Sequence, residues 1–214
     1  MDGMIRCLPL FAALGLAACA PDYQPKVEGG NGVAAAPAPS GETETAIFAG
    51  GCFWCTEADF EKVPGVVSAV SGYTGGTLKD PTYEQVSAGG TGHYEAVRVT
   101  YDPAQVSYTQ LVDYYFRTVD PTDAGGQFCD RGDSYRTAIF VGGPEERRIA
   151  EAEKVEAGAT LADEVVTPVL PAAPFYEAEA YHQDYYKANS LKYRFYRTRC
   201  GRDARLAGLW GSAG

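Results

Sequence analysis

Residues Thr45–Cys55 read TAIFAGGCFWC, and this stretch decides how the folded part of the chain begins. The first five residues are apolar and favour a short strand. The glycine pair at 50–51 ends that strand, and we expect a helix from Cys52 to about Lys62, before the turn residues Val-Pro-Gly at 63–65. Cys52 therefore lies where a strand ends and a helix begins. The positive end of the helix dipole acts on a thiol in this position, lowers its pKa and favours the reactive thiolate.

Strands and helices alternate irregularly over the rest of the chain. The hydrophobic patterns predict strands at about 66–73, 93–101, 135–141 and 165–170, and helices at about 107–118, 144–157 and 177–189. The regular strand–helix–strand spacing of a doubly wound sheet is missing from this order. We therefore expect an α+β fold, with helices packed on a mixed or antiparallel sheet.

The composition is that of an ordinary globular protein. The 214 residues are enough for one full-sized domain and a tail, with 45% hydrophobic and 21% charged residues. The formal net charge of −10 argues against binding to nucleic acid or to an acidic lipid surface. Neither is expected as a partner.

The first 19 residues have the pattern of an export signal. Arg6 precedes an apolar run of 11 residues, Leu8–Ala18, which is too short to span a bilayer but fits the core of a signal peptide. The run ends in Leu-Ala-Ala-Cys, which resembles the lipoprotein cleavage box, so Cys19 is expected to become a lipidated N-terminus. An ordinary secretory signal that is removed is the alternative. Residues 20–44, rich in Pro, Gly and Ala, are expected to form a flexible linker, and 45–214 the folded domain.

Cysteine usage points to chemistry. An exported domain of this size does not need disulfides for stability, so its thiols require another explanation. Cys7 would leave with the signal. The cysteines of the folded domain are Cys52, Cys55, Cys129 and Cys200.

Cys52 and Cys55 form a C-x-x-C pair, for which three interpretations compete. A zinc site needs four ligands, and a second such pair or paired histidines are missing from the sequence. A thioredoxin-like redox pair fits the strand–turn–helix context, although Phe53 and Trp54 between the cysteines are unusual there. The third interpretation makes Cys52 the nucleophile and the two aromatic residues the wall of a substrate pocket.

Glu95 helps to separate the last two interpretations. In the strand at 93–101 it shares one face with Val97 and Val99. Burial of a carboxyl group on an apolar face raises its pKa and keeps it protonated near neutrality, as a general acid requires. An edge-strand glutamate that reaches solvent is the alternative.

Polar residues of two loops are further candidates. Asp130 and Tyr135 lie in the segment CDRGDSYR, which leads into the strand at 135–141, and Tyr83 follows Asp-Pro-Thr. Loops held by rigid strands often carry site residues, but by themselves these patterns indicate only loops.

Short motifs follow one another along almost the whole folded part. They are Gly51–Trp54 (GCFW), Val63–Val66 (VPGV), Ser71–Gly76 (SGYTGG), Pro81–Tyr83 (PTY), Thr91–Val97 (TGHYEAV), Tyr101–Pro103 (YDP), Asp120–Thr122 (DPT), Tyr135-Arg136 and Tyr181–Gln183 (YHQ). In this order they resemble the peptide methionine sulfoxide reductase A family. The resemblance covers about 46–186.

The resemblance implies a ferredoxin-like α/β sandwich, in which helices flank a mixed sheet, without a metal or an organic cofactor. It also implies a set of site residues and their roles. These are Cys52 as nucleophile, Phe53 and Trp54 as the pocket for the substrate's methyl group, Glu95 as acid, Tyr83 and Tyr135 as hydrogen-bond donors to the sulfoxide oxygen, and Asp130 as the family's site aspartate.

The implied reaction reduces the S epimer of methionine sulfoxide, free or in proteins. Protonated Glu95 polarises the S=O bond, the Cys52 thiolate attacks the sulfur, and methionine departs from a cysteine sulfenic acid. A second thiol then forms a disulfide, which an external thioredoxin-like dithiol reduces. Cys55, Cys129 and Cys200 are the candidates for this resolving thiol, with Cys55 or Cys200 favoured.

The expected protein is thus a monomeric repair enzyme that faces the periplasm from a lipid anchor. A secreted or soluble periplasmic form is the alternative location. Two other functions stay open: a general thiol–disulfide oxidoreductase that uses Cys52 and Cys55, and an anchored protein that binds oxidised methionine without turnover. Both methionines, Met1 and Met4, lie in the signal, which fits a protein that works where methionine is oxidised.

Overall fold

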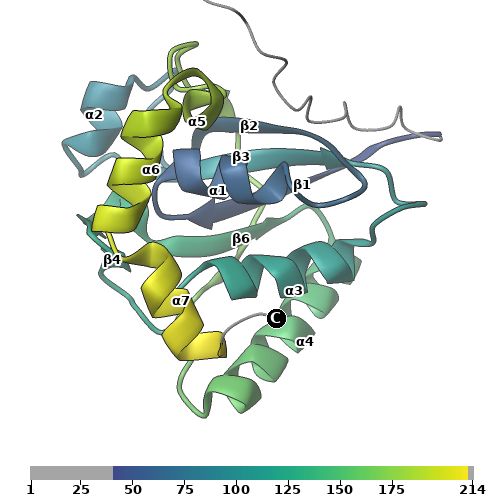
Figure 1. The fold of residues 1–214 in the computed structure, drawn as a ribbon. Helices are drawn as coiled ribbons and strands as arrows, with labels where there is room; N and C mark the ends of the chain where they lie inside the picture. Colours follow the sequence, from purple (N-terminus) through teal and green to yellow (C-terminus); the bar gives the residue numbers. More distant parts are fainter. Residues whose placement is uncertain (1–40, 212–214) are drawn as a thin grey trace, which may run out of the picture. The chain divides into compact units, whose positions relative to one another are not determined.

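The computed structural model describes residues 41–211, and Figure 1 shows how their helices and strands are arranged. The predicted signal at 1–19, with Cys19, and most of the predicted linker lie outside the described residues. The first strand begins at Glu44, one residue before the predicted start of the folded domain. Among the helices of the described part, none has the length and apolar character needed to cross a membrane.

Strands and helices of the described residues occur in mixed order. The strands are β1 (Glu44–Gly50), β2 (Val66–Thr74), β3 (Tyr94–Tyr101), β4 (Gly126–Gln127), β5 (Asp130–Arg131), β6 (Thr137–Val141), β7 (Val169–Pro171) and β8 (Tyr176–Glu177). The helices are α1 (Phe53–Phe60), α2 (Tyr83–Ser87), α3 (Tyr108–Thr118), α4 (Pro144–Leu161), α5 (Tyr185–Ala188), α6 (Ser190–Arg199) and α7 (Arg202–Trp210), with a 3₁₀ turn η1 (Asp133–Tyr135) before β6. Helices α2 and α3 both begin at capping boxes, in which Thr82 and Ser107 accept a backbone hydrogen bond.

A mixed sheet forms the centre of the fold. Its strand order is β7-β6-β1-β3-β2-β8, and β4 and β5 form a separate hairpin. β1 pairs antiparallel with both β3 and β6, whereas β6 and β7 run parallel. Figure 1 shows α1 lying across the strands that it contacts, β1, β2 and β3. The predicted class, α+β with a mixed sheet flanked by helices, is confirmed.

The main core lies on the sheet face that α1 and α3 cover. Phe48 of β1 and Val97 and Val99 of β3 are fully buried in it, and the rings of Phe48 and Phe60 stack 4.8 Å apart. Removing such side chains from water is the main favourable term in folding. Glu95 lies on this same face of β3, as the alternation predicts, and its carboxyl group bonds to the first residue of α1. The fold therefore places a carboxyl group in the core.

The segment after β7 differs from the sequence-based prediction. The predicted helix at 177–189 is wrong: β8 joins the edge of the sheet, turns follow, and within that range the four residues of α5 are α-helical. Gln183 bonds to the sheet and not to a helix of its own. Its side-chain oxygen accepts from the N–H of Ser71 at 3.0 Å, and its side-chain nitrogen donates to the carbonyl oxygen of Ser71 at 2.9 Å. The predicted strand at 165–170 is shorter and shifted, since β7 begins after Pro168.

Helices α6 and α7 are not predicted by the sequence patterns, because α6 (SLKYRFYRTR) is strongly basic and has no continuous apolar stripe. Long-range polar contacts hold them in place. Nη1 of Arg197 donates to both carboxylate oxygens of Asp59 of α1, at 2.9 and 3.0 Å. Arg202 is buried and donates to the carbonyl oxygens of Gly50 and Thr118, at 3.2 and 2.7 Å. These two arginines dock the C-terminal helices against the β1–α1 turn.

Candidate active site

The β1–α1 turn presents Cys52 at the N-terminal end of α1. Gly51 adopts a φ of +79°, and a Cβ atom there would lie 2.5 Å from the Cβ of Gln127, so the turn requires glycine. Cys52 is the N-cap residue of α1, and its carbonyl oxygen accepts from the N–H groups of Cys55 and Thr56. The chain thus leaves the sheet, turns sharply and begins a helix at the cysteine.

A cavity of about 90 Å³ opens at this turn. Residues of α1, α2, β3, β5, η1 and α6 line it. The structure brings together all seven residues to which the resemblance gave a catalytic or binding role: Cys52, Phe53, Trp54, Tyr83, Glu95, Asp130 and Tyr135. Tyr196 of α6 also lines the cavity and has no place in the sequence-based prediction. Cys55, Cys129 and Cys200 are not among the lining residues.

Glu95 is a buried acid beside the cysteine. It is 2% exposed, and its Oε2 accepts a hydrogen bond from the Phe53 N–H at 3.0 Å. Burial raises the pKa of Glu95 to about 8, although the hydrogen bond from Phe53 opposes the shift. The alternative of an edge-strand glutamate is wrong, because β3 lies between β1 and β2. Glu95 therefore keeps its proton at neutral pH and can donate it.

Tyr83 and Tyr135 face Glu95 across the cavity. Burial, followed by the charge of Glu95, raises the pKa of both phenols, and their hydroxyl groups hydrogen-bond to each other. The backbone N–H of Tyr83 donates to Glu179 Oε1 at 2.9 Å, which fixes the start of α2. Both tyrosines thus remain protonated hydrogen-bond donors at neutral pH.

Cys52 and Cys55 are buried free thiols, 6% and 2% exposed. Burial raises the pKa of Cys52, so the prediction that the helix dipole leaves it a thiolate is wrong for the resting protein. A hydrogen bond from Cys52 lowers the pKa of Cys55 to about 7, and the charges of Arg202 and Arg197 act in the same direction. Of the two, Cys55 is thus the thiol that ionises first.

Aromatic contacts hold the wall of the cavity. The indole N–H of Trp54 donates to His182 Nδ1 at 3.0 Å, and the ring stacks on Tyr185 with centroids 3.8 Å apart. Phe53 also packs against the His182 ring, with ring centroids 4.9 Å apart. Sequence reasoning gave neither His182 nor Tyr185 a role, although His182 belongs to the YHQ motif. Both orient Trp54.

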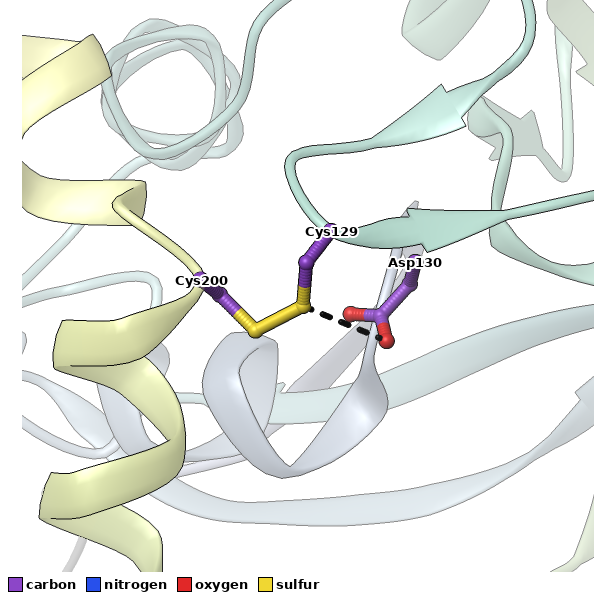
Figure 2. Close-up of side chains that lie close together, drawn as sticks. All are labelled: Cys129, Asp130 and Cys200. Atoms are coloured by element: carbon purple, nitrogen blue, oxygen red, sulfur yellow. Dashed lines mark hydrogen bonds between the residues drawn. A yellow bond between two sulfur atoms is a disulfide. The ribbon is translucent and has the colours of Figure 1, made fainter.

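Asp130 lies beside a disulfide. Cys129, which precedes it, is bonded to Cys200 at the end of α6, as Figure 2 shows. The Cys129 sulfur lies 3.8 Å from Asp130 Oδ1. Tyr196 donates a hydrogen bond to the other carboxylate oxygen of Asp130. Burial raises the pKa of Asp130, while Tyr196 and the charge of Arg202 lower it. The β4–β5 hairpin is thereby joined to α6 by a covalent bond and a hydrogen bond.

Two groups of possible metal ligands occur within the described residues, and both are already engaged. In the first, Cys129, Asp130 and Cys200, the two sulfurs are bonded to each other. In the second, Glu57, Glu61 and Asp184, the ammonium of Lys187 lies 2.5 Å from Glu61 and 2.6 Å from Asp184. The charge of Lys187 compensates those carboxylates.

The family model described as peptide methionine sulfoxide reductase matches residues 44–213. "Peptide methionine sulfoxide reductase MsrA 2" of Caulobacter vibrioides is 60% identical over 171 residues, which are 79% of this chain and 87% of that protein. The solved methionine sulfoxide reductase A of Corynebacterium diphtheriae is 36% identical with a TM-score of 0.63, over 70% of this chain and 76% of that one. Mxr1 of Saccharomyces cerevisiae, in reduced form, is 30% identical with a TM-score of 0.67, over 70% and 87%. On this evidence the chain belongs to the peptide methionine sulfoxide reductase family.

Proposed function

We propose that this protein reduces the S epimer of methionine sulfoxide, free or in proteins, to methionine. One observation carries the proposal: a protonated buried carboxyl group, two tyrosine hydroxyls and a cysteine line the same aromatic-walled cavity. Membership of the family supports the reaction and its stereochemistry. The chemistry requires the carboxyl group and the two hydroxyls at the sulfoxide oxygen, the cysteine at the sulfoxide group that it attacks, and the aromatic wall at the methyl group.

The substrate's methyl group is expected to lie against Phe53 and Trp54. An apolar aromatic wall favours the burial of such a group. The hydrogen bond from Trp54 to His182 and the stack on Tyr185 fix the indole ring before the substrate enters. Little conformational entropy is then lost on binding.

The sulfoxide oxygen is expected to face Glu95, Tyr83 and Tyr135. All three carry protons at neutral pH, because burial raises the pKa of each. Donors that are already oriented stabilise the charge that develops on this oxygen in the transition state. Transfer of the Glu95 proton then makes the oxygen ready to leave the methionine sulfur.

Cys52 attacks the polarised sulfoxide in this scheme. Its sulfur is oxidised by two electrons, the substrate sulfur is reduced by two, and the oxygen passes to Cys52 as a sulfenic acid. Methionine leaves the cavity. The cavity thus provides an acid for the oxygen and a nucleophile for the transfer.

Cys55 is the resolving thiol that we propose. It lies in the first turn of α1, in the same buried cluster as Cys52, and its lowered pKa of about 7 makes a thiolate available. Attack on the Cys52 sulfenic acid gives a Cys52–Cys55 disulfide and water. Cys129 and Cys200 are already bonded to each other in the structure. A thioredoxin-like dithiol from outside then returns both Cys52 and Cys55 to thiols.

We further propose that the protein works as a monomer exported to the periplasmic side and anchored through lipidated Cys19. The support is the pattern of residues 1–19 and the Pro/Gly/Ala-rich linker at 20–44, ahead of the folded domain at 45–214. Incorporation of a labelled fatty acid, lost in Cys19→Ser, is the expected result.

The test assays the full chain on each separated sulfoxide epimer with excess dithiothreitol. We expect methionine from the S epimer alone, no product from Cys52→Ser, and a single turnover from Cys55→Ser when the reductant is withheld. Reduction of insulin disulfides without sulfoxide turnover would instead identify a general thiol–disulfide oxidoreductase. Tight sulfoxide binding without product would identify a binding protein.

A further inference from the structure

Tyr196 lines the cavity but is supplied by α6, 144 positions after Cys52 in the sequence. Its ring packs edge-on against Trp54, with centroids 5.9 Å apart and planes at 79°. Its hydroxyl donates a hydrogen bond to Asp130 Oδ2, and the sulfur of Cys52 lines the same cavity within hydrogen-bonding reach of that hydroxyl. Tyr196 therefore connects the nucleophilic sulfur to a carboxyl group.

The Cys52 thiol needs a proton acceptor before it can attack. Burial is the main reason that a thiolate is disfavoured there, and the hydrogen bond and the charge of Cys55 act in the same direction. Glu95 holds its own proton, so it cannot accept another. Asp130 is the carboxyl group within reach of the Tyr196 hydroxyl, and the guanidinium of Arg202 favours its ionised form.

We propose that Tyr196 is a further catalytic residue, whose hydroxyl passes the proton of Cys52 to Asp130 as the sulfur attacks the substrate. The S–H bond of Cys52 breaks and its proton joins the Tyr196 oxygen, while the phenolic proton moves to Asp130 Oδ2. The electron pair left on the Cys52 sulfur forms the new bond to the substrate, and Glu95 protonates the sulfoxide oxygen. The substrate S–O bond then breaks: its electron pair stays on the methionine sulfur, which is reduced, and the protonated oxygen ends on Cys52 as the sulfenic acid. The step ends with Asp130 protonated and Glu95 ionised. Asp130 then releases its proton to solvent, and Glu95 takes one up from solvent.

The Cys129–Cys200 disulfide, which Figure 2 shows beside Asp130, connects the backbone next to Asp130 with the end of the helix that carries Tyr196. Cys129 directly precedes Asp130 in the chain. The N–H of Cys200 donates to the carbonyl oxygen of Tyr196 at 2.9 Å, in the last turn of α6. The disulfide and the hydrogen bond between Tyr196 and Asp130 therefore join the same two segments, and the disulfide limits how far the backbones that carry Tyr196 and Asp130 can separate.

Several ionisable groups face the sulfur and the acceptor, so a pH profile must be read against all of them. They are Cys55 of α1, Tyr83 of α2, Glu95 of β3, Tyr135 of η1, Tyr196 of α6 and Arg202 of α7. Ionised Asp130 is required for the route, so the first-turnover rate should fall at low pH as Asp130 takes up a proton. Above neutrality the rate should fall as Glu95 loses its proton.

The test measures methionine formed in one turnover, without reductant, by the full chain and by Tyr196→Phe. Removing a proton-transfer group typically costs on the order of 10²-fold in rate, and we expect this loss with KM changed less than about threefold. The apparent pKa of the low-pH limb should also rise, towards the pKa of a Cys52 thiol that has no proton acceptor. Asp130→Asn should show the same loss, and the double variant should lose no more than either single one.

Tyr186→Phe is the matched control, because it removes a tyrosine hydroxyl that hydrogen-bonds a carboxylate, Glu61, outside the cavity lining. It should leave the rate and the low-pH limb unchanged. An unchanged first turnover in Tyr196→Phe, or a loss that is fully additive with Asp130→Asn, would overturn the proton route and leave Cys55 as the acceptor. The inference rests on the proposed function, and a wild-type protein without any turnover would overturn both.

Discussion

Glu95 and Cys52 illustrate how burial decides the charge of a side chain. Both groups lie in the core beside the start of α1, and in both the loss of solvent favours the neutral form. For Glu95 the result is an acid that keeps its proton at neutral pH. For Cys52 burial outweighs the helix N-terminus, so the thiol must lose its proton during the reaction.

The activity should fall with rising pH because of Glu95. The required form is protonated, and burial raises its pKa to about 8, so kcat/KM should be lost as the pH rises above that value. A pH profile of S-epimer reduction measures this limb. Glu95→Gln should lower the rate by about 10²- to 10³-fold and abolish the limb. Persistence of the same limb in Glu95→Gln would assign it to another group.

His182 should control substrate affinity through Trp54. His182→Leu removes the acceptor of the indole N–H, and an unsatisfied buried donor costs about 1–3 kcal/mol, so we expect KM to rise roughly five- to tenfold with a smaller change in kcat. His182→Asn keeps an acceptor near the position of Nδ1 and should recover most of the affinity. Equal KM values for the Leu and Asn variants would contradict this role.

At the scale of elements, the backbone conformation of the β1–α1 turn determines where Cys52 lies. β1 has to end beside the hairpin β4–β5, and α1 has to begin within two residues so that Cys52 faces the cavity. Gly51 permits this through its left-handed backbone and its close contact with Gln127. Arg202 also stabilises this turn, because its guanidinium donates a hydrogen bond to the carbonyl oxygen of Gly50.

Gly51→Ala should destabilise the protein by about 2–4 kcal/mol, because the left-handed backbone disfavours an L side chain and the new methyl group overlaps Gln127. Chemical denaturation measures the change in the free energy of unfolding. Gly158→Ala is the control, since that glycine lies inside α4 with ordinary contacts and should gain about 0.5–1 kcal/mol. A loss of similar size in both variants would argue against strain at the turn.

At the scale of the whole described domain, the C-terminal helices complete a site that the sheet and α1 begin. Tyr196 reaches the cavity from α6, and Arg197 and Arg202 provide positive charge near Cys55. Ion pairs with Asp59 and the disulfide from Cys200 attach this region to the rest of the domain. The cavity therefore depends on residues from both ends of the domain.

Breaking the disulfide should lower global stability. The bond closes a loop with a sequence separation of 71, and chain entropy then predicts a loss of about 4 kcal/mol in Cys129→Ser/Cys200→Ser. Urea denaturation of the double variant and the wild type, without reductant, measures the difference. Adding dithiothreitol should bring the wild type to the value of the variant. Coinciding transitions without reductant would show that the bond adds no stability.

Much of the fold follows from local patterns. Strands β1, β2, β3 and β6 and helices α1, α3 and α4 are apolar or amphipathic, and the sequence predicts them to within a few residues. The short elements α2, β4, β5 and η1 were not predicted, and neither was the arrangement after residue 165, where tertiary contacts replace periodicity. Gln183 bonds to the edge of the sheet instead of forming a helix, and α6 is stabilised by ion pairs and a disulfide that no hydrophobic pattern encodes.

By itself, the sequence determined the motifs, the family that they resemble, and the side chains available for chemistry, because those depend on residue types and their order. The alternation of β3 also placed Glu95 on the core face. Tertiary structure alone decided the charge states, since burial and long-range neighbours set the pKa of Glu95, Cys52 and Cys55. It likewise decided the pairing of Cys129 with Cys200 and the entry of Tyr196 into the cavity, because these join segments that no local interaction brings together.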